Sequence, residues 1–368
     1  MAKRKGEAQW VESRKRWQVK VQNEGIRRTF IDHTPGKTGK ISAEQQADRW
    51  LEDPLVDENA RVGDLLDEYF ENLKLTTSKS HYRPYDGYIR NWIKPVIGMR
   101  KVVKLTQSDL QLVIDKAYAS KKLSEKTLEK MRACLMNFIK YCRSKNLTTF
   151  RPDTLKIPAS AKASEKTIAS ADEIKILFSV TTTLDHNKKV EDRYIHAYRF
   201  AVLTGIRPGE LIGLIHDDII GSRIKISRSI NAYNEVTSGK NRNARRTYAL
   251  DEHALKVLSD QKQMLISLGE ISPYVFPDKN RDFIKQQTLR KSWKRYCDAN
   301  GIKAAKTPYE LRHTFVSVND EMPSALKKMV VGHSKNMDTE GIYGHEKADD
   351  MDRAAQYINA AFKEILGW

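Results

Sequence analysis

Arg207 lies where a predicted helix begins, and the residues around it are of types that bind phosphate. In "LTGIRPGELIGL" a helix is predicted to end at Thr204-Gly205 and another to begin at Pro208, a residue favoured at the first helical position. Backbone N–H groups and a guanidinium converge on an anion at such a helix start. Glu210 follows one turn later and can brace the arginine. The stretch therefore predicts an anion site.

Three later stretches add a lysine, a second arginine, a histidine and a tyrosine. "TSGKNRNARRTYAL" predicts a turn and a strand, with Lys240 near the tip of the turn. "TPYELRHTF" predicts a helix that begins after Thr307 and carries Arg312 in its second turn. In "VGHSKNMDTEGIYGHE", Tyr343 stands ten residues after His333.

These residue types suit the attack of a tyrosine hydroxyl on a phosphodiester. The pentacovalent transition state carries negative charge on two non-bridging oxygens, which two guanidinium groups can hold bidentately. A lysine or histidine can protonate the leaving 5′-oxygen, and the tyrosine stays attached as a phosphotyrosine. Because arginine and lysine supply the countercharge, we expect no metal ion and no cofactor. The sequence also has no evident Asp/Glu cluster for paired Mg²⁺.

Each of these residues also has a plainer interpretation. An arginine after a glycine turn is usually a surface or capping residue, and Lys240 lies in a basic run that can simply meet phosphates. A structural role fits His313 and His345 better than a catalytic one. A metal site built from His313, His333 and His345 is disfavoured, because the H-E-x-x-H spacing of metal-binding helices is absent.

Composition indicates a polyanionic partner. Lys and Arg total 65 against 47 Asp and Glu, a net charge of +18 over 368 residues, and nucleic acid is the commonest polyanion. A ribosome-like or merely basic protein is the alternative. The three cysteines are scattered, no apolar run approaches the ~20 residues of a membrane span, and no apolar stretch follows the first residues. These features predict a cytoplasmic protein.

Residues 1–55 predict a small basic sheet followed by a helix. Apolar and polar residues alternate in "RWQVKVQNEGIRRTF", which is strand periodicity, and "TPGKTGK" is a second cluster of turn residues. Ser42 and Gln45 fit a capping box that opens a helix through Leu51. Such a sheet either reads a DNA groove, which its charge favours, or forms a dimer. The predicted DNA contacts are Arg14, Lys15, Arg16, Lys20, Arg27 and Arg28, with Arg242, Arg245 and Arg246 further along the chain.

The rest of the chain divides into a helical block and a mixed block. Across 61–150, apolar stripes at helical spacing appear in "VGDLLDEYFENL" and "LEKMRACLMNFIKYC", and Thr106 and Ser124 are predicted N-caps. "RPDTLKIPASAKASEKT" is predicted to be an interdomain linker. Residues 168–368 begin with the capping-box pattern "SADE" and mix helices with a basic hairpin.

Together and in this order, the four stretches resemble the boxes of the tyrosine recombinases, the family of phage and conjugative-transposon integrases. "GIRPGE" matches a Gly-hydrophobic-Arg-x-x-Glu box, and Lys240 before "RRTYAL" matches a hairpin lysine before an Arg-Arg-Thr strand. "YELRH" matches a His-x-x-Arg-His box in part, and "GHSKNMDTEGIYGH" matches a Gly-His-Ser box with its nucleophile. The resemblance is specific from about residue 168 onward and weaker upstream.

The resemblance implies a multidomain α+β fold, the tyrosine recombinase fold. It implies an N-terminal sheet-plus-helix domain (1–55) that binds arm-type DNA, an all-α core-binding domain (61–150) and a mainly α catalytic domain with a small sheet (168–368). The arginines would clamp the scissile phosphate, the lysine would protonate the leaving oxygen, the histidine would hydrogen-bond the phosphate or the nucleophile, and the tyrosine would attack. The implied catalytic residues are Arg207, Lys240, Arg312, His333 and Tyr343 (nucleophile), supported by Glu210 and His345.

Two positions depart from the family pattern. Tyr309 stands where the family most often has histidine, and His216 stands where a tryptophan is expected. A phenol does not serve as a general base at neutral pH as imidazole does, so we expect Tyr309 to donate a hydrogen bond to a non-bridging oxygen beside Arg312. The alternative is that Tyr309 packs in the core. For His216 we expect only a change in packing.

The implied function is integration and excision of a mobile element on double-stranded DNA, through four protomers and a Holliday junction. We expect a monomer in solution, a possible excisionase or host DNA-bending partner, and no membrane partner. A C-terminal exchange helix with an apolar stripe of Ile358, Ala361, Phe362 and Ile365 is expected to dock on a neighbouring protomer, or else on its own domain. The alternatives are an Xer-like chromosome resolvase, a type IB topoisomerase and a non-catalytic DNA-binding relative.

Overall fold

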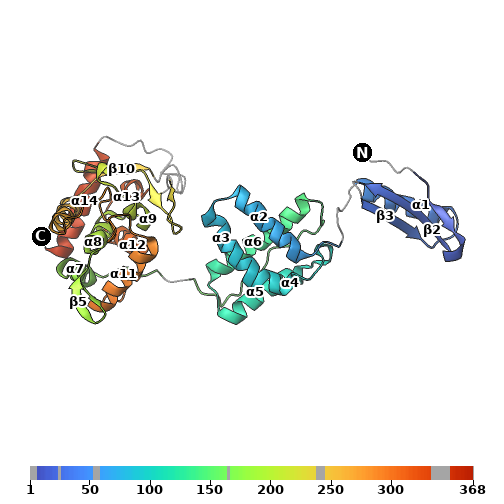
Figure 1. Cartoon of the computed structure of the whole chain (residues 1–368), viewed down its shortest axis with the longest axis horizontal. Helices are drawn as coiled ribbons and strands as arrows, with labels where there is room; N and C mark the ends of the chain where they lie inside the picture. Colours follow the sequence, from blue (N-terminus) through green and yellow to red (C-terminus); the bar gives the residue numbers. More distant parts are fainter. Residues whose placement is uncertain are drawn as a thin grey trace. The chain divides into compact units, whose positions relative to one another are not determined.

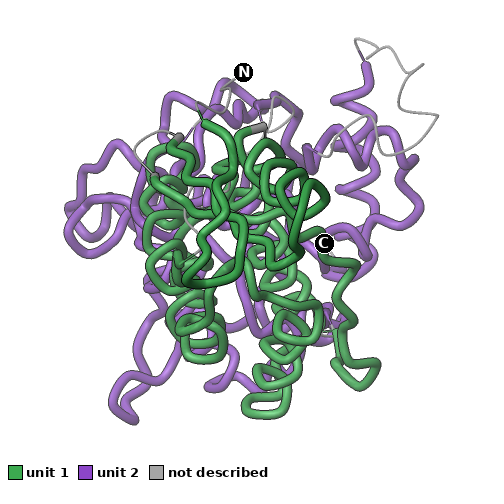
Figure 2. Tube along the Cα trace, turned by 90° about the vertical axis from the view of Figure 1, so that its right-hand side faces the viewer, with its two compact units in different colours: residues 1–164 green, residues 165–368 purple. Residues whose placement is uncertain are grey.

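The chain forms two compact units, residues 1–164 and 165–368, which Figure 2 colours separately. The computed structural model describes residues 6–23, 26–52, 59–163, 166–237, 245–332 and 349–367. Among these residues, the first unit holds two hydrophobic clusters with no residue in common, and the second unit holds one. The boundary between the units falls within the predicted linker.

A three-stranded antiparallel sheet and one helix form the N-terminal part of the first unit (Figure 1). The elements are β1 (Gln9–Val11), a 3₁₀ turn (Glu12–Arg14), β2 (Arg16–Asn23), β3 (Ile26–Asp32) and α1 (Lys37–Glu52). The strand order is β1-β2-β3. Val19 and Val21 of β2 are buried with Ala47 and Trp50 of α1, so the helix covers one face of the sheet. The predicted pair of strands is confirmed.

The predicted start of α1 is wrong. The helix begins at Lys37, so Ser42 and Gln45 lie inside it rather than at its cap. Gly39 stands in the first turn, where an added Cβ would come within 1.9 Å of the carbonyl oxygen of Thr34. Glycine at this position lets the helix begin tightly against the preceding chain. A composition that normally indicates a turn therefore belongs to a helix here.

Helices make up the second part of the first unit. They are α2 (Val62–Thr76), α3 (Lys79–Tyr88), a π-helical turn (Ile89–Ile93), α4 (Lys94–Ile97), a 3₁₀ turn (Val102–Lys104), α5 (Gln107–Lys121) and α6 (Glu125–Ser144). Both predicted apolar stripes are buried in one cluster, apart from the half-buried Phe70. Thr106 forms the predicted cap, in a capping box with Asp109. Ser124 is the predicted N-cap residue of α6, but its hydroxyl lies 2.9 Å from that of Thr127 and forms no capping hydrogen bond to the backbone.

Most of the predicted linker is packed against the units that it joins. Leu155 is fully buried in the helical core. The side chain of Gln111 accepts a hydrogen bond from the backbone N–H of Lys156 (2.8 Å) and donates one to its carbonyl oxygen (2.9 Å). At the far end, the hydroxyl of Thr167 donates to Glu310 (3.0 Å). The proline-rich composition gave no indication of these contacts. The stretch that joins the two units without packing on either is therefore shorter than the predicted linker.

The second unit surrounds the buried helix α8 with helices and a small sheet (Figure 1). In chain order its elements are α7 (Ala171–Ser179), β4 (Thr182–Asp185), β5 (Lys188–Glu191), α8 (Ile195–Thr204), α9 (Pro208–Ile212), a 3₁₀ turn (His216–Asp218), β6 (Ile219–Ile220), β7 (Arg223–Ile226), β8 (Ser229–Ile230), β9 (Val236–Thr237), β10 (Arg246–Ala249), α10 (Glu252–Ser267), α11 (Gln286–Asn300), α12 (Pro308–Val318), α13 (Ser324–Val331) and α14 (Asp350–Leu366). The sheet is antiparallel with the order β10-β7-β6, and β4-β5 and β8-β9 are hairpins.

Helix α14 packs on its own unit. Ile358 is 2% exposed and Phe362 is fully buried, both within the core of the second unit, and Ile365 packs against that core. The expectation that this stripe docks on a neighbouring protomer is therefore wrong, and the alternative within one chain is confirmed. Among the described residues, no helix combines the length and the apolar character needed to cross a membrane.

Candidate active site

A sharp turn between α8 and α9 positions Arg207. Gly205 ends α8 with a left-handed φ of 61°, which glycine adopts without steric cost. A Cβ added at Gly205 would also lie 2.4 Å from the ring of Phe315. Arg207 is then the N-cap of α9, with Pro208 at the first helical position. The predicted arrangement of helix end, turn and helix start is confirmed.

Glu210 holds the guanidinium of Arg207 from behind. Nη1 of Arg207 donates to Oε1 of Glu210 (2.7 Å), and the backbone N–H of Arg207 donates to Oε2 (3.1 Å). Glu210 is 3% exposed. Burial raises the pKa of its carboxyl, but the hydrogen bond and charge of Arg246, and then those of Arg207, outweigh burial and lower the pKa overall. The carboxylate is therefore charged at neutral pH and balances the arginines.

Arg312 lies on α12, which begins after Thr307 as predicted, and the backbone N–H of Thr307 donates to the side chain of Glu310 (2.7 Å). The side chain is 2% exposed. Nη1 donates to the carbonyl oxygen of Gly205 (2.8 Å), and Nη2 donates to that of Val331 (2.7 Å). Burial, followed by the nearby charges of Arg207 and Arg246, lowers the pKa of Arg312 to about 10. The guanidinium thus remains charged at neutral pH while fixed to two parts of the backbone.

Arg246 belongs to this site and not to the exposed basic surface that the sequence predicted. Its side chain is 6% exposed. Nη2 and Nη1 donate to the two carboxylate oxygens of Glu210 (2.9 and 3.2 Å), and Nε donates to the carbonyl oxygen of Val330 (2.6 Å). Strand alternation explains the error, because Arg246 is on the same face of β10 as the buried Tyr248, whereas Arg245 is exposed. The two-residue alternation along this strand was the signal in the sequence that could have assigned Arg246 to the buried face.

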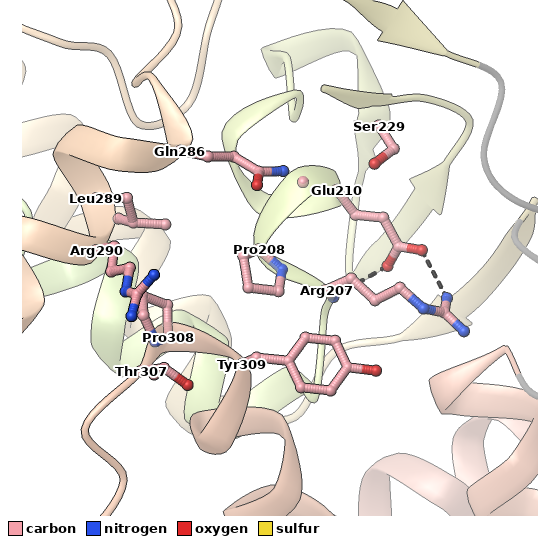
Figure 3. Close-up of a pocket in the computed structure, with 11 residues that line it drawn as sticks. Arg207, Pro208, Glu210, Ser229, Gln286, Leu289, Arg290, Thr307, Pro308 and Tyr309 are labelled. Atoms are coloured by element: carbon pink, nitrogen blue, oxygen red, sulfur yellow. Dashed lines mark hydrogen bonds and ion pairs between the residues drawn. The ribbon is translucent and has the colours of Figure 1, made fainter. Parts of the chain in front are cut away.

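A pocket of about 490 Å³ opens beside Arg207 (Figure 3). Figure 3 shows the guanidinium of Arg207 and the hydroxyl of Tyr309 pointing toward the same end of the pocket, with Arg290 on the opposite side. Tyr309 is 44% exposed, so the alternative that it packs in the core is wrong. Its ring meets the edge of His313 at 5.1 Å between centroids. The pocket is lined by Arg207, Pro208, Gly209, Glu210, Ser229, Gln286, Leu289, Arg290, Thr307, Pro308 and Tyr309.

The remaining predicted catalytic residues lie outside the described part of the chain. These residues are Lys240, His333, Tyr343 and His345, together with the predicted DNA contact Arg242. The segments that lead to them do reach the site. Gly332, which precedes His333 in the sequence, accepts a hydrogen bond from Nη2 of Arg207 through its carbonyl oxygen (2.9 Å). Arg246 begins the strand that follows Lys240 in the sequence.

The basic residues of the N-terminal sheet divide between its two faces. Lys20 and Arg27 are exposed on the face opposite α1, where Lys20 pairs with Thr29 across the strands. Arg28 lies on the other face, with its guanidinium 5.0 Å from the centre of the Phe30 ring. Arg14 and Lys15 are exposed and Arg16 is half-buried. Arg28 is therefore less available to DNA than the sequence predicted.

His216 and His313 are two further histidines of the second unit. His216 is exposed, so its replacement of the expected tryptophan is not a core packing change. Burial, followed by the charges of Lys166 and Arg312, lowers the pKa of His313. Within the described ranges, no three His, Cys, Asp or Glu side chains lie together as possible ligands for a metal ion.

Comparisons with known proteins agree with this geometry. The model of the Phage integrase family matches residues 168–349, and that of the phage integrase N-terminal SAM-like domain matches residues 62–118. No curated protein matches the sequence.

Solved integrase structures share the fold. The Tn1549 transposon integrase, in complex with a circular intermediate DNA, is 17% identical over 80% of this chain and 98% of its own, with a TM-score of 0.62. The lambda integrase, as a dimer bound to a core site, is 16% identical over 78% of this chain and 100% of its own, with a TM-score of 0.57. The lambda integrase tetramer bound to a Holliday junction is 15% identical over 93% and 98%, also with a TM-score of 0.57.

The two family models cover residues 62–118 of the helical block and residues 168–349 of the second unit, and Arg207 and Tyr309, one from each arginine box, line the same pocket. The chain therefore belongs to the phage integrase family of tyrosine-type site-specific recombinases.

Proposed function

We propose that the chain is an active integrase, which inserts and excises a mobile element by cutting and rejoining DNA strands through Tyr343. One observation carries the proposal. The guanidinium groups of Arg207 and Arg312 come from separate boxes, yet both donate to backbone carbonyls at the end of α13, Arg207 to Gly332 and Arg312 to Val331. Arg207 also borders an open pocket. Two fixed cations, one of which borders a pocket, match the charge of a phosphodiester in its transition state.

In the proposed reaction, the phenolic oxygen of Tyr343 attacks the scissile phosphorus. A phosphorus–oxygen bond to the tyrosine forms as the bond to the 5′-oxygen breaks, so the number of phosphodiester bonds is unchanged. The phenolic proton of Tyr343 passes to solvent as this bond forms, Lys240 gives its proton to the departing 5′-oxygen and regains one from solvent, and His333 hydrogen-bonds the phosphate or the nucleophile. Arg207 and Arg312 stabilise the negative charge on the non-bridging oxygens. Attack by a 5′-hydroxyl on the phosphotyrosine reverses these steps and rejoins the strand.

The partner in this proposal is double-stranded DNA, bound by four protomers. The lambda integrase has been solved as a tetramer on a Holliday junction and the Tn1549 integrase with a circular intermediate DNA, and this chain carries a net charge of +18. The protein would be a monomer before it binds DNA, and an excisionase or a host DNA-bending protein would set the direction of recombination. It would associate with the nucleoid when bound.

We further propose three domains with different DNA sites. Residues 61–150 and 168–368 would close on the core site, and residues 1–55 would bind arm-type DNA through the exposed sheet face that carries Lys20 and Arg27. Separate hydrophobic clusters in the sheet part, the helical part and the second unit support this division.

Covalent trapping tests the proposed function. A pool of nicked duplexes with a randomised core is incubated with the full chain, because release of a short fragment from the nick prevents rejoining. Complexes that survive detergent are isolated, and their DNA is sequenced and resynthesised as a single selected duplex. We expect an enriched core sequence joined to the protein through a 3′-phosphotyrosine. If no covalent complex forms on any duplex in the pool, the chain is not an active recombinase.

Tyr309→Phe should slow cleavage of the selected duplex without abolishing it. A hydrogen bond to a charged oxygen contributes about 1.5–3 kcal/mol, which corresponds to roughly 10- to 150-fold in rate. Tyr309→His should stay active, because imidazole can donate the same hydrogen bond. Single-turnover cleavage rates measure both effects. A rate for Tyr309→Phe within about twofold of the parent, or ~0.4 kcal/mol, would show that the hydroxyl does not contact the phosphate.

Deletion of residues 1–55 should remove one class of DNA site and leave the other. In a binding selection on randomised duplexes, the full chain is expected to recover two sequence motifs and the truncated chain only the core motif, with cleavage of the core duplex retained. Lys20→Gln with Arg27→Gln in the full chain should weaken binding to the second motif and reduce its salt dependence by roughly 0.9 in log–log slope for each lost phosphate contact.

The exposed Arg49, on α1 and away from the sheet, supplies the matched control. Arg49→Gln removes one positive charge from the same domain and should change the salt slope little. The domain assignment is wrong if the truncated chain loses core cleavage while it still recovers the second motif.

A further inference from the structure

Arg246 is bound on every side by groups of the site and does not line the pocket. Two of its nitrogens bind both oxygens of Glu210, and its third binds the carbonyl oxygen of Val330. The residues that line the pocket include Arg207 and Glu210 but not Arg246. Each of its three nitrogens already binds a protein group, and the family resemblance through the strand "RRTYAL" leaves its role unassigned.

Three guanidinium groups bind three successive carbonyl oxygens at the end of α13. The carbonyl of Val330 receives Nε of Arg246 (2.6 Å), that of Val331 receives Nη2 of Arg312 (2.7 Å), and that of Gly332 receives Nη2 of Arg207 (2.9 Å). The C-terminal end of a helix carries partial negative charge, which favours cations there. The end of α13 thus acts as a template that sets the spacing of the arginines.

Arg246 joins this template to the other support of the site. Glu210 binds Arg207 directly (2.7 Å). Arg246 connects Glu210 to Val330, whose carbonyl comes just before those bound by Arg312 and Arg207. Without Arg246, the only link of this kind among the described residues between the carboxylate and the helix end would be Arg207 itself, through Glu210 (2.7 Å) and Gly332 (2.9 Å). The like charges of Arg207 and Arg312 would then be held beside each other by fewer contacts.

We propose that Arg246 is a positioning residue of the recombinase reaction. By bridging Glu210 and Val330, it fixes the distance between the Arg207 and Arg312 guanidiniums and so matches them to the two non-bridging oxygens of the scissile phosphate. The inference rests on the proposed function, because it concerns the same phosphate. A displacement of about 1 Å at such a site costs on the order of 10²-fold in rate.

The test compares Arg246→Gln and Arg246→Lys in the full-length chain with Arg223→Gln as control. Arg223 lies on the neighbouring strand β7, where its exposed guanidinium forms a surface ion pair with Asp352 (3.8 Å). Arg246→Lys keeps the charge, but a single ammonium cannot bind a carboxylate in the forked geometry and a carbonyl as a guanidinium does. Circular dichroism and the affinity for the selected duplex report on folding.

The decisive readout is the substrate dependence of the cleavage defect. Single-turnover rates are measured at saturating protein on the selected duplex and on the same duplex with a methylphosphonate at the scissile position. A methyl group replaces one charged oxygen, so misplaced arginines matter less. On the phosphodiester we expect a loss of ~10²-fold for Arg246→Gln with DNA affinity nearly unchanged, and a defect at least ~10-fold smaller on the methylphosphonate.

The outcomes separate the inference from the proposed function. An equal defect on both substrates, or lost affinity without a slower saturated rate, would make Arg246 merely structural and overturn the proposal. If Arg246→Gln does not fold, the same comparison with Arg246→Lys decides, and full activity of Arg246→Lys would overturn it too. A parent protein that forms no covalent complex on the phosphodiester would refute the proposed function itself, and this inference with it.

Discussion

Tyr343→Phe should bind the selected duplex as tightly as the parent and form no covalent complex with it. The substitution removes one oxygen and leaves the ring, so contacts with the DNA backbone that supply affinity remain. The nucleophile, however, is lost, and no other group can form the phosphotyrosine bond. Gel retardation measures binding, and detergent-resistant complexes measure trapping. Loss of the nucleophile should reduce trapping below detection at times when the parent is fully trapped.

Tyr357→Phe is the matched control for this substitution. Tyr357 lies on α14, packed at the edge of the core, and its hydroxyl has no role in the proposed reaction. It should trap DNA at the parental rate. Persistent 3′-phosphotyrosine in Tyr343→Phe would mean that another tyrosine attacks, and peptide mapping of the trapped DNA would identify it.

Arg312→Lys should lower the cleavage rate by about 10³-fold or more, the upper range for removal of one preorganised donor from an oxyanion site. Lysine keeps a positive charge but cannot bind two oxygens in a fixed fork. Because Arg312 is 2% exposed and bound to the carbonyls of Gly205 and Val331, the substitution also removes geometry that the rest of the site depends on. Single-turnover rates on the selected duplex measure the loss.

Arg312→Ala separates catalysis from stability. It leaves two buried carbonyl groups without their donors, at about 1–3 kcal/mol each, so the free energy of unfolding should fall by roughly 2–6 kcal/mol. Urea unfolding followed by circular dichroism measures this change. Arg223→Lys, on the surface of the sheet, should leave rate and stability near parental values. A slow Arg312→Lys protein with weak DNA binding and no slower saturated step would show that Arg312 serves affinity alone.

Local signals in the sequence predicted local structure well. The caps at Thr106, Ser170 and Thr307 and the turn at Gly205 lie where the sequence placed them, because a cap depends on residues within one turn of the helix. The cap predicted at Ser42 is wrong, because the same pattern of residues can occur inside a helix as well as at its start. The true start depends on Gly39 fitting against Thr34, a contact that spacing does not reveal.

Charge alone misassigned the arginines of a basic run. Arg245 and Arg246 are adjacent and identical in type, yet one is exposed and the other is bound to Glu210. The carboxylate that distinguishes them lies far away in the sequence, so only the folded chain brings the pair together. The apolar stripe of α14 shows the same ambiguity, because a stripe predicts that a face is buried but does not specify the partner that buries it.

The sequence by itself determined the family, the residue types proposed to act on the phosphate and the helices that begin at Pro208 and Pro308. These features depend on residue identity and short spacing, which a sequence displays directly. Only the tertiary structure decided that Arg246, Arg312 and Arg207 each bind one of three successive carbonyls at the end of α13. Buried charges need partners to offset lost hydration, and those partners come from distant segments that only folding brings within hydrogen-bond reach.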